Sequence, residues 1–276
     1  MRVRLVVNRA ARRGSRLGDA VAAELVRRGI EVTADETVAR GLDAIVVAGG
    51  DGTVAGQIPR ALALGIPIGI VPLGTFNDLA HALKIPLDVA DACALIAAER
   101  TRPIDVARVN DAYYATEASI GLSSRLARLQ RVEDKQRFGF LAIVASLFRV
   151  AWYARTFHVD VAYEGRRERL KAMQLTIANS AHFGGVITVD DAAIDDGWLD
   201  CYCVEVKTPF DLMSIVGAIV TGRRHSVAGL RTFRARSFEV RTRRAHRISA
   251  DGEPAGATPA RFEVLPRALR VFVPER

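Results

Sequence analysis

The sequence predicts an N-terminal α/β domain with a mainly parallel sheet, followed by a C-terminal β-sandwich-like domain with helices. Up to residue 100, short β-branched runs alternate with helical stretches, which is typical of parallel strands covered by helices. From Pro103 onward, segments with a period of two residues dominate, as in layered β domains. The chain has 276 residues and is 50% hydrophobic, so both units can bury a core. We predict domains at 1–102 and 103–276.

The first domain is expected to contain four strands and two helices. The strands share short β-branched runs bounded by turn residues and are predicted at 3–7, 30–33, 44–47 and 66–71. A helix over 17–28 is stopped by Gly29. Asp88 suits the N-cap of a closing helix that extends to about Arg100.

The second domain is expected to be built mainly from strands with alternating apolar residues. These strands are predicted at 157–163, 173–177, 199–206, 233–240, 261–265 and 269–273. Glu164 and Gly165 provide a turn between the first two strands. Helices are predicted at 123–135, 138–154 and 209–221.

Composition limits the class of protein without identifying a function. The net charge of +8 indicates an anionic partner, which could be nucleotide phosphate, an acidic membrane surface or nucleic acid. Three cysteines form neither a disulfide framework nor a metal pattern, which fits a reducing cytoplasm. The N-terminus lacks a secretory apolar region, and the longest apolar stretch, 138–153, falls short of the roughly 20 residues that cross a bilayer.

A glycine-rich loop follows the predicted buried strand at 44–47 and consists of Gly49, Gly50, Asp51, Gly52 and Thr53. Glycines let the backbone turn tightly and approach a ligand, so its N–H groups can hold phosphate oxygens. A carboxylate among phosphates requires a metal ion or a donated hydroxyl proton, and Mg²⁺ satisfies that requirement. The alternative is an ordinary strand-to-helix turn with Thr53 as its N-cap.

A second loop, 72–78, also follows a predicted strand. Gly74, Thr75 and Asn77 are expected to complete a nucleotide pocket, because ligands bind at the carboxyl ends of parallel strands. The alternative is a capping box formed by Thr75 and Asp78.

Five segments, taken in order and spacing, resemble one protein family: VVNRAARRGS, GGDGT, PLGTFND, ANSAHFGGVITVDDAAIDDGWLD and ISADGEP. The chain resembles the bacterial diacylglycerol kinase-like lipid kinases, which are related to sphingosine kinases and more distantly to NAD kinases. GGDGT is shared with NAD kinases and phosphofructokinases, whereas the DDGWLD and DGE segments are more specific. The resemblance implies an ATP-dependent and Mg²⁺-dependent lipid kinase with its active site in the cleft between two domains.

The resemblance also implies roles for individual residues. Asn8, the loop 49–53 and Thr75 would bind ATP and its magnesium ion. Asp251, or Glu253 close behind it, would be the general base, because a lipid hydroxyl needs a carboxylate to accept its proton. Asp51 is the third carboxylate of this catalytic set. Without the resemblance, Asp251 and Gly252 predict only a hairpin turn.

A second, structural magnesium ion is implied at the segment 193–198. The Asp196 side chain and the backbone carbonyls of Ala193 and Trp198 would be its ligands. Four more acids lie nearby and would repel one another without a cation or basic neighbours, namely Asp190, Asp191, Asp195 and Asp200. The alternative is an exposed acidic turn.

The chain also departs from the family pattern. Arg9 stands where the family usually has proline, and residues 54–57 lack the usual asparagine and glutamate. A soluble-substrate kinase and a nucleotide-binding regulatory protein without catalysis therefore remain alternatives.

A lipid substrate places the protein at a membrane surface, held peripherally, with no nucleic-acid partner and with a homodimer left open. Basic side chains beside an anionic leaflet contribute about 1 kcal/mol each. The arginines concerned are Arg223, Arg224, Arg231, Arg234, Arg236, Arg241, Arg243, Arg244 and Arg247. The alternative is that alternating strand positions simply expose these arginines to water.

Overall fold

The computed structural model describes residues 1–8, 14–35, 41–121, 156–180, 182–183, 187–188, 193–205, 211 and 229–275. The predicted helices at 123–135 and 138–154 lie outside the described residues, as does 209–221 except for Asp211. In the described part of the chain, no helix is long and apolar enough to cross a membrane.

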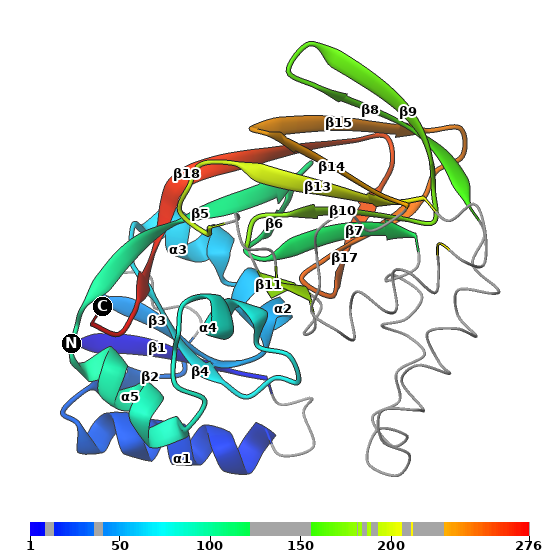
Figure 1. The fold of residues 1–276 in the computed structure, drawn as a ribbon. Helices are drawn as coiled ribbons and strands as arrows, with labels where there is room; N and C mark the ends of the chain where they lie inside the picture. Colours follow the sequence, from blue (N-terminus) through cyan, green and yellow to red (C-terminus); the bar gives the residue numbers. More distant parts are fainter. Residues whose placement is uncertain are drawn as a thin grey trace, which may run out of the picture.

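The N-terminal part is a parallel sheet with helices on both faces (Figure 1). Its strands run in the order β2-β1-β3-β4, with bounds β1 Arg2–Val7, β2 Glu31–Thr33, β3 Ala44–Gly49 and β4 Ile68–Pro72. One face packs against α1 (Gly14–Arg27) and α5 (Val89–Ala97). The other face packs against α2 (Asp51–Ala55), α3 (Ile58–Leu64) and α4 (Asp78–Ala82). Every residue of β3 is buried, as expected of a strand covered on both sides.

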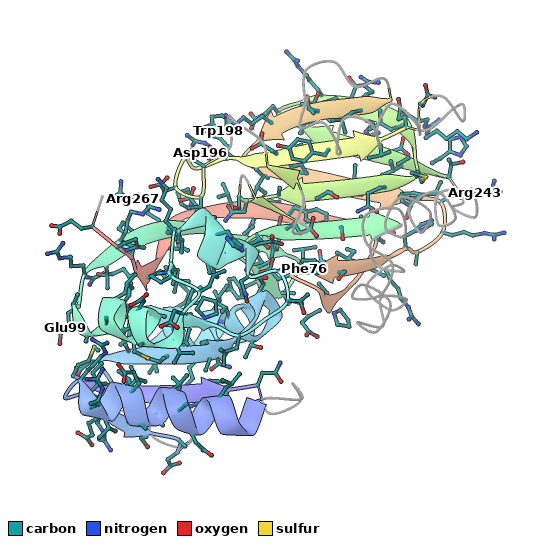
Figure 2. The ribbon with its side chains drawn as sticks, turned by 60° about the horizontal axis from the view of Figure 1, so that its bottom comes forward. Phe76, Glu99, Asp196, Trp198, Arg243 and Arg267 are labelled. Atoms are coloured by element: carbon teal, nitrogen blue, oxygen red, sulfur yellow. The ribbon has the colours of Figure 1, made fainter. Side chains whose placement is uncertain are left out.

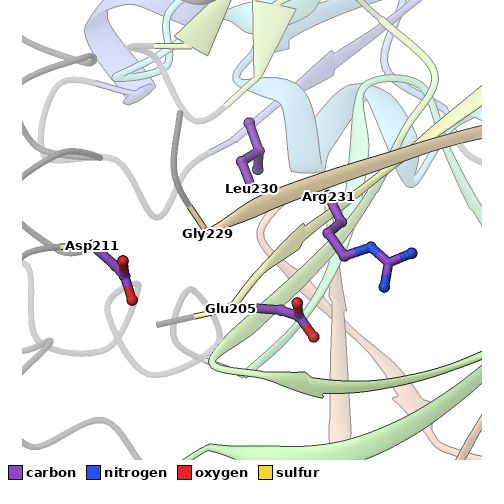
Figure 3. A pocket seen from close by; sticks show the side chains of 5 residues that line it. All are labelled: Glu205, Asp211, Gly229, Leu230 and Arg231. Carbon is purple, nitrogen blue, oxygen red and sulfur yellow. The ribbon is translucent and has the colours of Figure 1, made fainter. Parts of the chain in front are cut away.

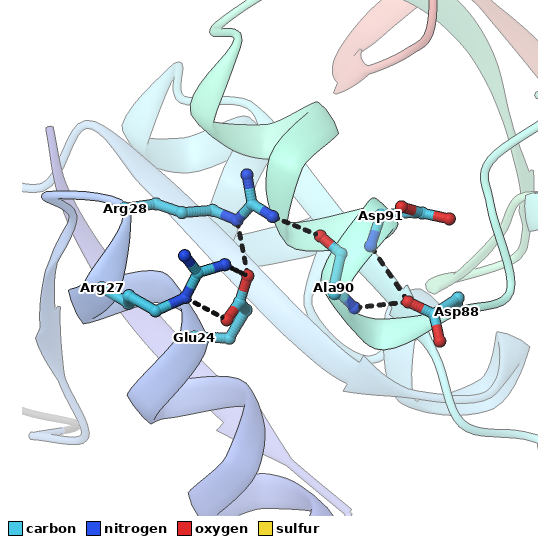
Figure 4. Close-up of polar contacts among 6 residues, drawn as sticks. All are labelled: Glu24, Arg27, Arg28, Asp88, Ala90 and Asp91. Carbon is cyan, nitrogen blue, oxygen red and sulfur yellow. Dashed lines mark hydrogen bonds and ion pairs between the residues drawn. The ribbon is translucent and has the colours of Figure 1, made fainter.

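Helices α1 and α5 are joined by polar contacts at their ends (Figure 4). The Arg28 guanidinium donates to the Ala90 carbonyl at 3.1 Å and also pairs with Glu24 at 2.7 Å. Asp88 accepts the N–H groups of Ala90 and Asp91 at 2.8 and 3.2 Å, which confirms the predicted N-cap of α5.

The second part of the chain is a sandwich of two sheets. One sheet has ten strands and includes the four strands of the N-terminal part. Its other six strands are β5 Thr101–Val109, β6 Ala112–Tyr114, β8 Phe157–Tyr163, β9 Arg166–Ala172, β15 Ser237–Thr242 and β18 Ala260–Phe272. The six-stranded sheet has the order β14-β13-β10-β7-β16-β17. Its bounds are β7 Glu117–Gly121, β10 Gln174–Ala178, β13 Leu199–Val204, β14 Leu230–Ala235, β16 Arg247–Ala250 and β17 Glu253–Ala257. One apolar core joins the inner faces of both sheets, which confirms the predicted fold class.

Strand β18 connects the two parts of the molecule. It pairs antiparallel with β15 and β5, and near its end Val271 pairs in parallel with Ile68 of β4. The last strand therefore extends the N-terminal sheet into the sandwich (Figure 1). The predicted boundary between residues 102 and 103 falls inside β5, and the division into two domains stays a prediction.

Two strand predictions differ from the structure. The predicted strand 233–240 is divided at Arg236, because β14 belongs to the six-stranded sheet and β15 to the ten-stranded sheet. Conversely, the predicted strands 261–265 and 269–273 are one strand, β18, with an irregular register between Leu265 and Leu269. Arg267 has a positive φ of 52° in this bulge.

Candidate active site

The glycine-rich loop forms the turn between β3 and α2. Helix α2 begins at Asp51 with Gly50 as its N-cap, and the Thr53 N–H donates to the Gly50 carbonyl at 2.9 Å. The alternative that made Thr53 the N-cap is therefore wrong. The Thr53 hydroxyl instead accepts a hydrogen bond from the Asn8 side chain at 3.4 Å. The loop after β3 and the end of β1 thus lie together, as the resemblance implied for these two residues.

The second loop packs directly on the first. A Cβ atom added to Gly74 would lie 2.5 Å from the Gly50 Cα, so only glycine fits there. Asn77, with a φ of 53°, closes the loop through its side chain, which accepts from the Gly74 N–H at 2.9 Å and donates to the Gly74 carbonyl at 3.1 Å. The loops at the carboxyl ends of β3 and β4 therefore form one continuous surface, in which the backbone of their glycines is uncovered by side chains.

Asp51 ties this surface to helix α4. Its two carboxylate oxygens accept the N–H groups of Asp78 and Leu79 at 3.1 and 3.0 Å. Asn77, rather than Thr75, is the N-cap residue of α4, and it makes no side-chain cap bond. The sequence suggested that Thr75 and Asp78 cap α4, but the capping carboxylate is that of Asp51 in the neighbouring loop. These hydrogen bonds also hold Asp51 in a fixed position.

Asp251 lies in a two-residue hairpin turn between β16 and β17. Asp251 and Gly252 both have positive φ, 45° and 85°, as a type I′ turn requires. The buried Asp251 carboxylate accepts the N–H groups of Ala115, Thr116 and Glu117 at 2.7, 3.0 and 3.0 Å, and also the Thr116 hydroxyl. The hairpin prediction is correct, and the same residue anchors the connection between β6 and β7.

The glycine-rich loop and the hairpin turn are in contact. A Cβ atom added to Gly52 would lie 3.0 Å from Glu253 Cγ and Oε1 and 3.1 Å from the Asp251 carbonyl. Glu253 itself is exposed. Segments about 200 residues apart are thus in contact, and the glycine-rich loop that carries Asp51 lies against the turn that carries Asp251 and Glu253.

Sequence reasoning missed Glu117, which shares this site. Burial, together with the nearby charges of Asp251, Asp78 and Asp51, raises the pKa of Glu117 to about 8. Burial also raises the pKa of Asp251 to about 6, against the lowering effect of its hydrogen bonds from Thr116, Ala115 and Glu117. An acid at the start of strand β7, whose other residues are small or apolar, was the available signal. Carboxylates in such proximity favour a proton or a cation among them.

Asn179 is a second residue that the sequence did not single out. It is 2% exposed, and its side-chain amide donates to the carbonyls of Ala115 and Asp105 at 2.9 and 3.1 Å. Its backbone N–H donates to the Thr116 carbonyl at 2.8 Å. Asn179 therefore supports the same 115–117 segment that holds Asp251.

Other candidate residues lie apart from this site. Ala193, Asp196 and Trp198 form a turn before β13 (Figure 2), and Arg9, Asp190 and Asp191 lie outside the described residues. A pocket of about 220 Å³ next to β13 and β14 is lined by Glu205, Asp211, Gly229, Leu230 and Arg231 (Figure 3). None of the predicted site residues lines that pocket.

Comparisons with known proteins identify the family and agree with the fold. Residues 3–109 match the family model described as the diacylglycerol kinase catalytic domain, and residues 118–273 match the YegS C-terminal NAD kinase beta sandwich-like domain. A protein of Pseudomonas aeruginosa named "Probable lipid kinase YegS-like" is 32% identical over 249 residues, covering 87% of this chain and 80% of that protein.

Two further relatives extend the comparison. An uncharacterized protein of Synechocystis is 28% identical over 259 residues, covering 92% of this chain, and the chain spans 60% of that relative's length. A crystal structure of a Bacillus anthracis protein, named provisionally as a diacylglycerol kinase, superposes with a TM-score of 0.81 at 25% identity. That likeness covers 99% of this chain and 95% of the other.

The contact at Gly52 predicts a steric effect on stability. Gly52→Ala places a methyl group against Glu253 and the Asp251 carbonyl, so we expect a loss of about 1–3 kcal/mol in the free energy of unfolding. The matched control is Gly56→Ala, whose Cβ would make ordinary contacts of 3.5 and 3.6 Å. Urea denaturation of both variants measures the difference. Equal stability of the two variants would contradict the contact.

The raised pKa of Glu117 predicts a pH-dependent stability difference. The folded protein keeps this proton up to a pKa of about 8, whereas the unfolded chain loses it near 4.5, so Glu117 lowers the stability progressively over that interval. Glu117→Gln should therefore gain stability relative to the unmodified protein between pH 5 and 8, with no further gain above. The measurement is urea denaturation across this pH range in metal-free buffer.

The control for this pH series is Glu99→Gln, which changes an exposed glutamate. Its stability difference from the unmodified protein should stay constant between pH 5 and 8. A constant difference for Glu117→Gln as well would mean that Glu117 ionises as an ordinary solvent-exposed acid.

Proposed function

The chain belongs to the diacylglycerol kinase-like lipid kinase family, and on that premise we propose that it transfers the γ-phosphoryl group of ATP to a hydroxyl group of a lipid. The observation that carries the proposal is the contact between Gly52 and the Asp251–Glu253 turn. A glycine-lined phosphate surface and a carboxylate from the other sheet are the two parts that phosphoryl transfer to an alcohol needs.

The nucleotide side of the site consists of two loops without bulky side chains at their contact. Gly50 and Gly74 bring the loops together, so phosphate oxygens can approach the backbone closely. Polar side chains of Asn8, Thr53 and Asn77 surround this surface. Thr75 is an exposed neighbour in the same loop.

The residues present fit a magnesium ion bound with ATP. The charges of Asp251, Asp78 and Asp51 raise the pKa of Glu117, and the charge of Asp51 raises that of Asp251. Such an excess of carboxylate is stabilised by a divalent cation. Asp51 would hold the ion from its position in the glycine-rich loop 49–53. When bound, Mg²⁺ supplies neutralising charge for the transferring phosphoryl group.

The two candidate bases have different surroundings. The Asp251 carboxylate is buried and already accepts hydrogen bonds from three N–H groups and one hydroxyl, which suits a positioning residue. Glu253 is exposed and lies against the phosphate loop at Gly52. We therefore assign the proton-accepting role to Glu253 and the positioning of the turn to Asp251, which reverses the order that the sequence suggested.

Paired variants test this assignment. Glu253→Gln should lower kcat by about 10²–10⁴-fold while ATP affinity and Tm stay unchanged, because only the proton acceptor is lost. Asp251→Asn should lower both kcat and Tm, because an amide group would face N–H donors in a buried site. The measurements are steady-state kinetics, ATP titration and thermal unfolding. Near-normal turnover in Glu253→Gln would return the role to Asp251.

The proposed reaction is tested directly by product partition. Purified protein is incubated with labelled ATP, Mg²⁺ and a total bacterial lipid extract, and a labelled organic-phase product is expected. A labelled aqueous product would instead support a soluble-substrate kinase, and ATP binding without turnover would support a regulatory protein. Glu253→Gln is the matched control, since it keeps the phosphate surface.

Peripheral attachment to an anionic membrane is part of the same proposal. Arg243, Arg244 and Arg247 are exposed around the turn between β15 and β16, and Figure 2 shows Arg243 projecting from the edge of the molecule. Other arginines are engaged with acids of the chain, as in the pairs Arg231–Glu168 and Arg241–Glu239. Arg223 and Arg224 lie outside the described residues.

The three buried cysteines fit a reducing cytoplasm.

A further inference from the structure

The acidic turn before β13 is closed by its own backbone. The Asp196 carboxylate accepts the Ala193 N–H through Oδ2 at 3.0 Å and the Trp198 N–H through Oδ1 at 2.9 Å. The side chain that the resemblance assigns to a structural metal ion thus already satisfies two backbone donors. Figure 2 places Asp196 and Trp198 beside one another at the end of this turn.

Arg234 brings a guanidinium group to the same carboxylate. Arg234 lies on β14 directly opposite Asp200 of β13, and its side chain forms an ion pair with Asp196 Oδ2. Its Nε lies 3.7 Å from Asp200 Oδ1. The side chains of Asp196 and Asp200 are only 23% and 18% exposed, so these charges are partly shielded from water.

The neighbouring polar groups are also satisfied by the protein. Asp195 pairs with Arg102 at 3.3 Å. The buried carboxylate of Asp105 accepts the N–H groups of Gly197 and Arg267 at 2.6 and 2.7 Å.

A divalent cation does not fit this arrangement. The Arg234 guanidinium already pairs with Asp196 Oδ2, and it would repel a divalent cation bound to the same carboxylate. The predicted ligands Ala193, Asp196 and Trp198 lie in one turn, and the positive charge beside the Asp196 carboxylate comes from the chain itself.

We infer that Arg234 is a built-in cation that takes the place of the structural magnesium ion in this chain. The guanidinium neutralises Asp196 and Asp200 and fixes the turn at the start of β13 without metal. The need for Mg²⁺ is then confined to the nucleotide site. This inference concerns stability and does not depend on the proposed activity.

The test compares thermal unfolding in EDTA and in excess Mg²⁺, without nucleotide. Arg234→Gln should lower Tm by about 3–8 °C, because it leaves two half-buried carboxylates without their cation. Arg234→Lys should retain most of the stability, since it keeps a positive charge. The matched control is Arg236→Gln, which removes a guanidinium 5.2 Å from the Trp198 ring but no ion pair with Asp196.

The effect of Mg²⁺ on Tm is measured in the Asp196→Asn variant. The shift in Tm between EDTA and Mg²⁺ should be the same in this variant as in the unmodified protein, because any response then comes from the nucleotide site. A Mg²⁺ response that Asp196→Asn abolishes would overturn the inference. Equal Tm values for Arg234→Gln and Arg236→Gln would overturn it too. Neither of these Tm comparisons depends on kinase activity, so failure of the proposed function would leave this result intact.

Discussion

The close approach of Gly52 to the Asp251–Glu253 turn is the constraint on which the site depends. A Cβ atom at position 52 would lie 3.0 Å from the Glu253 side chain and 3.1 Å from the Asp251 carbonyl, so the glycine-rich loop and the hairpin turn are in close contact. Asp251 maintains that approach, because its buried carboxylate binds the 115–117 segment while its carbonyl faces Gly52. Strand β18 joins the N-terminal strands to the sandwich within the ten-stranded sheet, because it pairs with both β15 and β4.

The sequence predicted the elements of this fold better than their connections. Buried runs such as Ala44–Gly49 and the cap at Asp88 are local patterns, and they appear in the structure as expected. The break at Arg236 could not be predicted, because one alternating pattern continues while the chain moves from one sheet to the other. The continuity of β18 through its bulge depends on β5 and β15, which are distant in sequence.

The candidate site shows the same division between local and long-range information. The loops 49–53 and 72–78 are recognisable from glycines after strands. The capping of α4 by Asp51 and the charge environment of Glu117 arise between segments and have no local signature. The acidic turn is the clearest case, since its sequence resembles a segment to which the family resemblance assigns a metal ion, whereas in the structure Arg234 from another strand pairs with Asp196.

A double-mutant cycle between positions 52 and 253 tests whether the glycine-rich loop and the Asp251–Glu253 turn form one site. The free energies of unfolding of Gly52→Ala, Glu253→Ala and the double variant are compared. Removing the Glu253 side chain opens space for the new methyl group, so Gly52→Ala should cost clearly less in the Glu253→Ala background. Strict additivity of the two substitutions would contradict the account.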